Sequence, residues 1–352
     1  MNQVAHNIYI HVPFCMSKCN YCAFYSRACA NPDWAAYADK ICAELAFWSQ
    51  KMERIDVPTV FFGGGTPSLM PVDVFERIMA SISTNFNLLP DAEVTLESNP
   101  GTLDESKLND FISLGVNRLS IGVQSLSDDK LKFLGRRHSA DDALRLLTAA
   151  QNRGLRVSAD FIYGLPDETA HDVADVCAQI NGLGLTHCSL YELTVEPDTP
   201  FGKMNLSMPD NETMAQMYTT IGEVLHLPRY EVSNYCTPGS ECRHNLNVWD
   251  GAPYIGVGQG AAGRVLFDGD WYELLGNNAR FEKMSLENRA IECVITGLRT
   301  VRGCRLTQAV KKVIDMDWVR SHPTLVGVQS DCIATTKSGM LVLDEVLVNL
   351  VK

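Results

Sequence analysis

The first two hundred residues alternate between short β-rich runs and longer helical patterns, and this alternation limits the possible folds more than any other feature of the sequence. The β-rich runs predict strands at residues 8–12, 59–62, 93–97, 118–122, 156–162 and 187–193. Helical patterns lie between them, at residues 34–52, 71–85, 104–114, 139–152 and 169–181. Strands that alternate with helices form parallel sheets with right-handed crossovers. The strand segments are mostly apolar rather than alternating, which is typical of strands covered on both faces.

Polar and glycine-rich segments follow the predicted strands at their carboxyl ends. Three cysteines come after the first strand, and the glycine-rich segment 63–67 comes after the second. Glu97 ends the third strand, Gln124 follows the fourth and Asp160 lies in the fifth. Barrels and open α/β sheets both place their sites at the carboxyl ends of parallel strands, so the pattern does not choose between these folds. The sequence therefore predicts an α/β protein with its site at this end of the sheet.

Beyond residue 205 the alternation stops. Residues 210–227 predict one helix, whereas residues 233–270 are rich in Gly, Asn, Pro and aromatic residues with few helical signals. Two more helices are predicted, from residue 287 and at 306–315, and a Ser-Gly hairpin is predicted at 335–343. The chain is thus expected to have three parts: an α/β part at 1–205, a small irregular extension at 206–280 and a winged-helix-like α+β domain at 281–352.

The charge balance argues against a protein that binds mainly through phosphate contacts. The chain has 30 basic and 42 acidic residues and a net charge of −12. Surfaces that bind nucleic acid are basic, so we expect no nucleic-acid partner. No apolar run approaches the roughly 20 residues of a membrane-spanning helix, and the first residues do not resemble a secretory signal. We therefore expect a cytoplasmic protein that is not an integral membrane protein.

Three of the 12 cysteines lie close together near the amino terminus. Cys15, Cys19 and Cys22 have the spacing C-x3-C-x2-C. Thiolates are soft ligands, and three of them on one loop can hold an iron–sulfur cluster or part of a zinc site. Zinc usually takes four ligands, which would require a contribution from Cys236 or Cys242. A [4Fe–4S] cluster held by three cysteines leaves one iron open to a small molecule, and the spacing favours this cluster.

Several motifs in a fixed order resemble those of a known family. YIHVPFC at 9–15 leads into the cysteine loop, which is followed by GGGTPS at 63–68. Further motifs are ESNPG at 97–101, NRLSIGVQS at 117–125, GLP at 164–166 and HNLNVW at 244–249. With these motifs the chain resembles the radical S-adenosylmethionine (SAM) superfamily. Within it, the chain is similar to the branch that contains the anaerobic coproporphyrinogen III oxidase and the HemW-type haem chaperones.

The resemblance implies a partial (β/α)6 barrel of parallel strands and a set of cofactor ligands. Cys15, Cys19 and Cys22 would hold the [4Fe–4S] cluster, whose open iron would bind the amino and carboxylate groups of SAM. Glycines in the GGGTPS segment would let the backbone approach SAM closely. The residues that match SAM-binding positions of the family are Tyr9, Tyr21, Gly64, Gly65, Thr66, Glu97, Gln124, Arg136, Asp160 and Thr194.

Two places in the sequence separate the oxidase from the chaperones. The oxidase carries a fourth cysteine two residues after the third, and this chain has Phe24 there, as in the chaperone branch. The HNLNVW motif resembles the HNxxYW motif of the chaperones, with Val248 in place of tyrosine. A later GxGAHG motif carries Ala262 in place of its histidine. His244 is therefore the expected haem ligand, and Trp249 is a candidate to cover the porphyrin.

The resemblance implies a haem chaperone that binds haem and transfers it to haem-requiring proteins. We expect haem and haem-accepting proteins as partners, with a homodimer as one assembly and with transient contacts to membrane proteins. The alternative is a radical SAM oxidase of coproporphyrinogen III or another substrate, acting through a 5′-deoxyadenosyl radical. Phe24 counts against coproporphyrinogen III as the substrate. A zinc-stabilised binding module is a third hypothesis, which the polar residues at the strand ends disfavour.

Overall fold

The parallel sheet predicted from the sequence is confirmed by the structure, a computed structural model that describes residues 4–52, 54–276 and 280–352. Neighbouring parallel strands follow one another in the sheet in their chain order: β1 (Asn7–Val12), β4 (Asp56–Gly64), β5 (Asn87–Ser98), β6 (Arg118–Gln124), β7 (Arg156–Tyr163) and β8 (His187–Glu192). These strands contain the predicted segments, except that the last prediction extends one residue too far.

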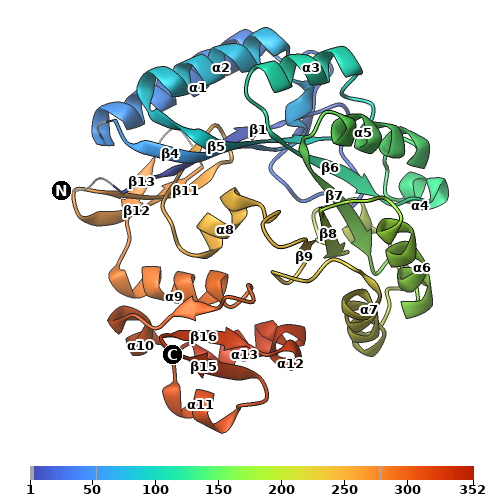
Figure 1. Cartoon of the computed structure of the whole chain (residues 1–352), viewed down its shortest axis with the longest axis vertical. Helices are drawn as coiled ribbons and strands as arrows, with labels where there is room; N and C mark the ends of the chain where they lie inside the picture. Colours follow the sequence, from blue (N-terminus) through green and yellow to red (C-terminus); the bar gives the residue numbers. More distant parts are fainter. Residues whose placement is uncertain (1–3, 53, 277–279) are drawn as a thin grey trace.

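The connections between these strands are helical and lie on the outer side of a curved sheet (Figure 1). They are α1 (Trp34–Met52), α2 (Val72–Asn85), α3 (Glu105–Ser113), α4 (Asp128–Phe133), α5 (Ala140–Asn152) and α6 (Ala170–Asn181). A short 3-10 helix, η1 (Pro67–Leu69), precedes α2. Capping boxes begin α5 and α6, because the hydroxyls of Ser139 and Thr169 accept hydrogen bonds from the backbone N–H groups of Asp142 and Asp172. The curved sheet with helices outside it agrees with the expected partial barrel.

The sheet continues at both edges with strands from the middle of the chain. After η2 (Phe201–Lys203) and α7 (Asn211–Val224), strand β9 (Asn234–Cys236) pairs antiparallel with β8. At the other edge β10 (Tyr254–Val257) pairs parallel with β1. Antiparallel strands extend that edge: β11 (Ala262–Phe267), β12 (Asp270–Leu275) and β13 (Phe281–Lys283). The expected irregular segment therefore contains regular strands, and also a helix, α8 (Arg243–Trp249).

The central strands carry different residues on their two faces. On the helix-facing side the residues are apolar and buried, as with Ile10 on β1, Phe62 on β4 and Ile121 on β6. On the inner side, polar residues such as Thr95 on β5 and Ser158 on β7 face a cavity. The expectation that both faces of these strands are covered was therefore wrong where the inner face of the sheet lines the cavity. The polar face forms the wall of a binding site rather than a core.

The last part of the chain has its own hydrophobic core. Its elements are α9 (Leu286–Gly297), β14 (Cys304–Arg305), α10 (Gln308–Val313), α11 (Met316–Ser321), β15 (Val326–Gln329), β16 (Cys332–Thr335), α12 (Lys337–Leu341) and α13 (Leu343–Leu350). The predicted Ser-Gly hairpin at 335–343 was wrong. Thr336 caps α12 there by accepting a hydrogen bond from Gly339, and the hairpin is β15–β16. This α+β content fits a winged-helix-like domain, and we keep the divisions 1–205, 206–280 and 281–352 as a proposal.

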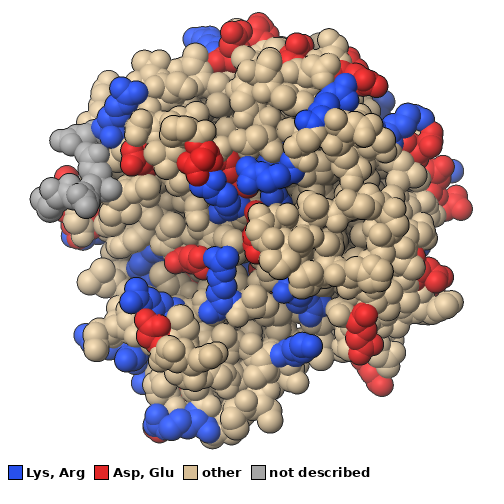
Figure 2. All heavy atoms as spheres, in the orientation of Figure 1, with Lys and Arg blue, Asp and Glu red and all other residues tan. Residues whose placement is uncertain are grey.

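Two surface properties bear on the expected partners. Within the described ranges, no helix has both the length and the apolar character needed to cross a bilayer. On the face shown in Figure 2, the basic side chains of the described residues lie in small groups with acidic side chains among them. They form no continuous basic stripe on that face. The expectation that nucleic acid is not a partner stays a prediction.

Candidate functional site

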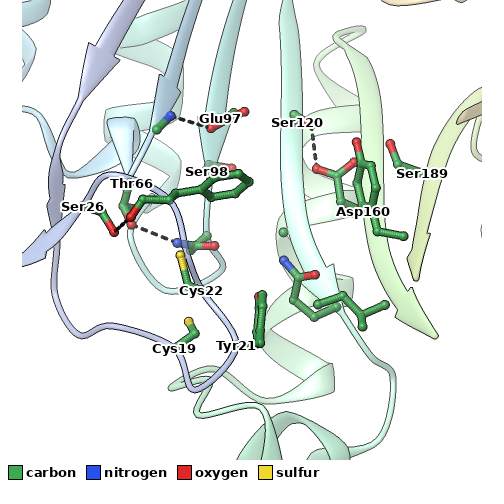
Figure 3. A pocket seen from close by; sticks show the side chains of 18 of the residues that line it. Cys19, Tyr21, Cys22, Ser26, Thr66, Glu97, Ser98, Ser120, Asp160 and Ser189 are labelled. Atoms are coloured by element: carbon green, nitrogen blue, oxygen red, sulfur yellow. Dashed lines mark hydrogen bonds between the residues drawn. The ribbon is translucent and has the colours of Figure 1, made fainter. Parts of the chain in front are cut away.

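The inner side of the curved sheet lines a cavity of about 460 Å³. This volume lies within the range of small-molecule sites, roughly 300–1,000 Å³. Inward-facing residues of β4 to β8 line the cavity, together with the cysteine loop that follows β2 (Phe14–Cys15). Figure 3 shows this loop with Cys19, Tyr21 and Cys22 on one side, and Glu97, Ser120 and Asp160 on the strands around the cavity. The site therefore lies at the predicted end of the strands.

The cysteine loop is tied to the barrel at several points. β2 pairs with β3 (Arg27–Ala28), which closes the base of the loop. At its tip, the backbone N–H of Asn20 donates to the carbonyl oxygen of Leu134 (3.1 Å), and its Nδ2 donates to that of Phe133 (2.8 Å). Cys15 is buried, whereas Cys19 and Cys22 are half-buried, and all three line the cavity. The loop thus presents three thiols to one space.

The three thiols fit an iron–sulfur cluster better than a single metal ion. Among the described residues, no three His, Cys, Asp or Glu side chains converge closely enough to bind one ion. Cys236 and Cys242 are therefore not brought to the loop as further zinc ligands. A cluster takes each thiolate on a different iron, so its ligands stand further apart than those of one ion. Burial raises the pKa of the Cys22 thiol, so the thiolate is unfavourable in the free protein. Coordination to iron would stabilise this thiolate.

The glycine-rich segment after β4 packs against the cysteine loop. Gly64 has φ = +114°, and a Cβ on this residue would lie 2.7 Å from the ring of His11. A Cβ on Gly65 would lie 2.6 Å from the carbonyl oxygen of Phe14 and 2.9 Å from Sγ of Cys15. Only glycine allows this close approach. Thr66 follows, buried in the cavity wall, and its N–H donates to Phe14 (2.8 Å).

Two carboxylates, Glu97 and Asp160, face the cavity from β5 and β7. Oε2 of Glu97 accepts a hydrogen bond from the N–H of Gly64 (3.0 Å). Burial, with a further contribution from Asp160, raises the pKa of Glu97 to about 8. Burial also raises the pKa of Asp160, although Ser120 (2.7 Å) and Ser158 (3.1 Å) donate hydrogen bonds to it. Both carboxylates would regain favourable partners from ligand hydroxyl groups.

A bulge at the end of β6 brings Gln124 and Arg136 together. The register with β7 shifts between Gly122 and Gln124, and Gln124 has φ = +67°, which is uncommon for a residue with a side chain. A Cβ on Gly122 would lie 2.7 Å from Nε2 of Gln124 and 3.1 Å from Nη2 of Arg136. Nη1 of Arg136 lies 3.4 Å from Sγ of Cys19, and its Nη2 donates to Asn99 and to the carbonyl oxygen of Gly122. The guanidinium is thus held beside the cysteine loop.

Of the three remaining residues predicted to bind SAM, two line the cavity and one does not. Tyr21 and Thr194 line the cavity. Tyr9 does not line it; its hydroxyl lies 2.9 Å from Nδ1 of His11, and its ring stacks on Phe61 at 6.1 Å. Contact between Tyr9 and SAM therefore stays a prediction that the observed position does not favour.

The predicted haem ligand lies on α8, behind the cavity wall. His244 is 4% exposed, and its ring packs against that of Phe61, with 5.0 Å between centroids. The hydroxyl of Thr59 donates to Asn7, so Nδ1–H of His244, 2.7 Å away, donates to Thr59. Its backbone N–H donates to Oε1 of Glu93 (3.0 Å). Burial lowers the pKa of His244 to about 3, so the imidazole is neutral, as a metal ligand must be.

Other residues near the predicted haem motif differ in their surroundings. Trp249 ends α8, and its ring lies 6.3 Å from that of Tyr230. Ala262, which replaces a family histidine, is exposed on β11. Cys236 is buried on β9, whereas Cys242 lines the cavity, and burial raises the pKa of its thiol to about 12. Contact of Trp249 with haem therefore stays a prediction.

Sequence reasoning missed the polar residues at the inner end of the cavity. The largest is Arg118, which begins β6 and is buried. His187 begins β8; its Nδ1 lies 2.8 Å from Oγ of Ser158 and its Nε2 lies 2.7 Å from the hydroxyl of Tyr230. Asn99 lies in the ESNPG motif, and no role was predicted for it. Its side chain is hydrogen-bonded to both Thr66 and Arg136. Successive side chains of a strand point to opposite faces, so taking every second residue of each predicted strand would have identified the inward-facing residues.

Similarity to known proteins agrees with this geometry. Residues 9–180 match the Radical SAM superfamily. The chain is 38% identical over 266 residues to "Heme chaperone HemW" of Escherichia coli K12, across 74% of this chain and 70% of that protein. It is 35% identical over 328 residues to "Heme chaperone HemW" of Synechocystis, across 85% of this chain and 79% of that protein.

A solved structure with the same fold is that of the coproporphyrinogen III oxidase HemN from Escherichia coli, described as a Radical SAM enzyme. The TM-score is 0.81, with 18% sequence identity, across 98% of this chain and 89% of that chain. At this identity the likeness concerns the fold alone. With the sequence relatives, the chain therefore belongs to the radical SAM superfamily and, within it, to the HemW-type family.

Proposed function

We propose that this protein is a haem chaperone that holds a [4Fe–4S] cluster and SAM in its cavity, binds haem and transfers it to haem-requiring proteins. One observation carries the cofactor part: the three cysteines and all predicted SAM residues except Tyr9 line the same cavity. The haem part is supported by the relatives named "Heme chaperone HemW". Phe24, in place of the fourth cysteine of the oxidase, supports the same choice. A cytoplasmic location and a homodimeric assembly belong to this proposal.

The cavity residues have distinct roles in this proposal. Cys15, Cys19 and Cys22 would hold the cluster, which supplies one-electron chemistry when it is bound. The guanidinium of Arg136, beside Cys19, would orient the carboxylate of SAM by charge-assisted hydrogen bonds. Glu97 would accept hydrogen bonds from the ribose hydroxyls, and these donors would lower its raised pKa.

The position of His244 sets a condition for its role as a haem ligand. Its ring packs against Phe61, and its Nδ1–H is used by Thr59. The hydrogen bond at Nδ1 leaves Nε2 as the nitrogen that could bind iron. For haem to reach it, α8 would have to move away from β4. We therefore propose that haem binding through His244 requires displacement of α8.

Anaerobic haem titration tests the proposal. The reconstituted protein, assayed for iron and sulfide, should bind haem with a stable Soret spectrum and should not convert coproporphyrinogen III. His244→Ala should weaken haem binding, whereas His171→Ala, on an exposed residue of α6, should not. The function is wrong if wild-type protein does not bind haem. The ligand assignment is wrong if His244→Ala leaves the haem stoichiometry and spectrum unchanged.

A radical SAM enzyme is the second candidate function, and the polar inner wall of the cavity favours it. Ser120, Ser189 and Asn234 line space beyond the predicted SAM residues, where a polar substrate could bind. Incubation with dithionite and SAM would distinguish the two functions. Formation of 5′-deoxyadenosine coupled to turnover of a porphyrinogen would support the enzyme and contradict a chaperone without catalysis.

A further inference from the structure

The inner end of the cavity contains buried polar atoms without partners in the described part of the chain. Arg118 is 1% exposed, and its Nη2 makes no hydrogen bond to any described residue. Oγ1 of Thr95 is likewise unpaired within the described ranges. Thr95 and Arg118 are register partners on β5 and β6, and both line the cavity. Leaving a buried polar group unpaired is unfavourable, and more so for a charged group, so two adjacent ones at a cavity point to a binding position there.

The rest of the Arg118 side chain is firmly held. Its Nη1 donates to the carbonyl oxygens of Ser240 (3.1 Å) and Glu241 (3.3 Å), in the segment that leads into α8. The same nitrogen lies 3.8 Å from Oε2 of Glu93. These contacts fix one edge of the planar guanidinium and leave Nη2 for the cavity. The donor is therefore already oriented before any ligand binds.

The charges around Arg118 favour a negatively charged ligand. Glu93 is shared by two cations, because Nη1 of Arg156 also lies 3.2 Å from its Oε2. Asp160 is a further acid near Arg118, and burial raises its pKa. Burial and the charge of Arg118 lower the pKa of His187, which is therefore neutral. Arg118 and Arg156 both face the carboxylate of Glu93, so their charges can also compensate an incoming anion, most easily when Asp160 is protonated.

We propose that the inner end of the cavity is a second binding subsite, in which Nη2 of Arg118 and the hydroxyl of Thr95 bind one carboxylate of a ligand. A carboxylate accepts hydrogen bonds from a guanidinium and from a hydroxyl at the same time. The subsite lies beyond the residues predicted to hold SAM, so the two ligands would occupy the cavity together. This last point rests on the proposed function.

Two ligands carry the required group: haem, through its propionate side chains, and a small carboxylic acid that enters alone. The first test detects the subsite without haem. The thermal unfolding midpoint is measured in sodium propionate and in propionamide at matched ionic strength. Propionate should raise the midpoint and propionamide should not, since a ligand stabilises the folded state that binds it.

Two variants and a control assign this effect to the subsite. Thr95→Val keeps the side-chain shape, leaves no charge unpaired, and should weaken propionate binding about tenfold. Arg118→Lys keeps the charge but has a single nitrogen in place of Nη1 and Nη2, and should abolish the difference between propionate and propionamide. Thr148→Val, on the exposed side of α5, should behave as wild type. If propionate and propionamide act alike on wild type, or if Thr95→Val responds fully, the inner end holds only water and the proposal is wrong.

The second test identifies the source of the carboxylate. SAM-loaded protein is titrated with haem and with its dimethyl ester, in which both carboxylates are blocked. If a haem propionate uses the subsite, haem should bind about 10- to 100-fold more tightly than the ester, and Thr95→Val should narrow this ratio. Equal binding of both, together with propionate selectivity, assigns the subsite to a small acid. Failure of wild type to bind either porphyrin contradicts the proposed function but not the subsite, because the propionate test does not use haem.

Discussion

The cysteine loop and helix α8 both carry motifs of the family, and the structure places their functional groups in opposite environments. At the loop, the three thiols line a cavity, and Arg136 lies beside them. On α8, the imidazole of His244 is buried against Phe61 and hydrogen-bonded to Thr59. Groups that line a cavity can bind a ligand without a change in the fold. Groups with partners of their own stabilise the fold and bind a ligand only when those partners are given up.

The largest expected effect is at the loop. Cys19→Ser should abolish retention of the [4Fe–4S] cluster, because one of its three thiolate ligands is lost. The fold should be retained, because Cys19 is half-buried and lies outside the hydrophobic cores. Iron and sulfide per chain after anaerobic reconstitution measure the effect, with Cys332→Ser on β16 as the control. Full iron and sulfide in Cys19→Ser would show that the loop does not hold the cluster.

Glu93, a buried acid next to α8, tests whether groups with partners of their own stabilise the fold. Glu93→Gln removes the charge that faces Arg118 and Arg156, and should lower the free energy of unfolding by about 3 kcal/mol. Urea unfolding measures this, and cluster content per folded chain should not change. Glu105→Gln is the control, because its pair with Arg153 is exposed and contributes about 1 kcal/mol or less. A small effect of Glu93→Gln would mean that α8 is not held by this network.

The pH dependence of stability should reflect the buried imidazole on α8. The pKa of His244 is about 3 in the folded chain and 6.5 when exposed, so below pH 6.5 the unfolded state binds a proton that the folded state does not. The free energy of unfolding should therefore fall as the pH falls, by about 2 kcal/mol between pH 6.5 and 5 from this residue. His244→Asn should lose this contribution in urea unfolding at the two pH values. Identical pH slopes for the variant and wild type would place His244 in contact with water.

The cavity should show the opposite dependence. The pKa of Glu97 is about 8 in the folded chain and 4.5 when exposed, so the folded state keeps a proton that the unfolded state has lost. The free energy of unfolding of the protein without cluster or SAM should fall as the pH rises, by about 1 kcal/mol between pH 6 and 7. Glu97→Gln, which is always neutral, should have a flatter profile. If the free energy of unfolding instead rises with pH, and Glu97→Gln removes this rise, then Glu97 is ionised in the free cavity.

Most of the parallel sheet could be predicted because each strand is a local pattern. Ile10, Phe62 and Leu119 lie in apolar runs bounded by turn residues, and these runs became the central strands. Helix α8 could not be predicted in this way. It has seven residues, too few for a stable helix by itself, and it is held by a hydrogen bond from His244 to Glu93, 151 positions away in the chain.

The prediction of a hairpin at residues 335–343 was wrong for a related reason. Ser338 and Gly339 are common in turns, but the preceding Thr336 is also a helix cap. Packing of Met340 into the core favours the helix. Local propensity allowed both structures, and burial in the assembled chain decided between them.

The order of strands and helices, and the three thiols that follow the first strand, were determined by the sequence alone, because both are patterns of neighbouring residues. Tertiary structure decided which polar residues meet. It placed Glu97, Arg136 and Asp160 around one cavity, left Nη2 of Arg118 facing it without a described partner, and buried His244 behind its wall. These outcomes depend on the curvature of the sheet and on strand register, through which residues far apart in the chain become neighbours.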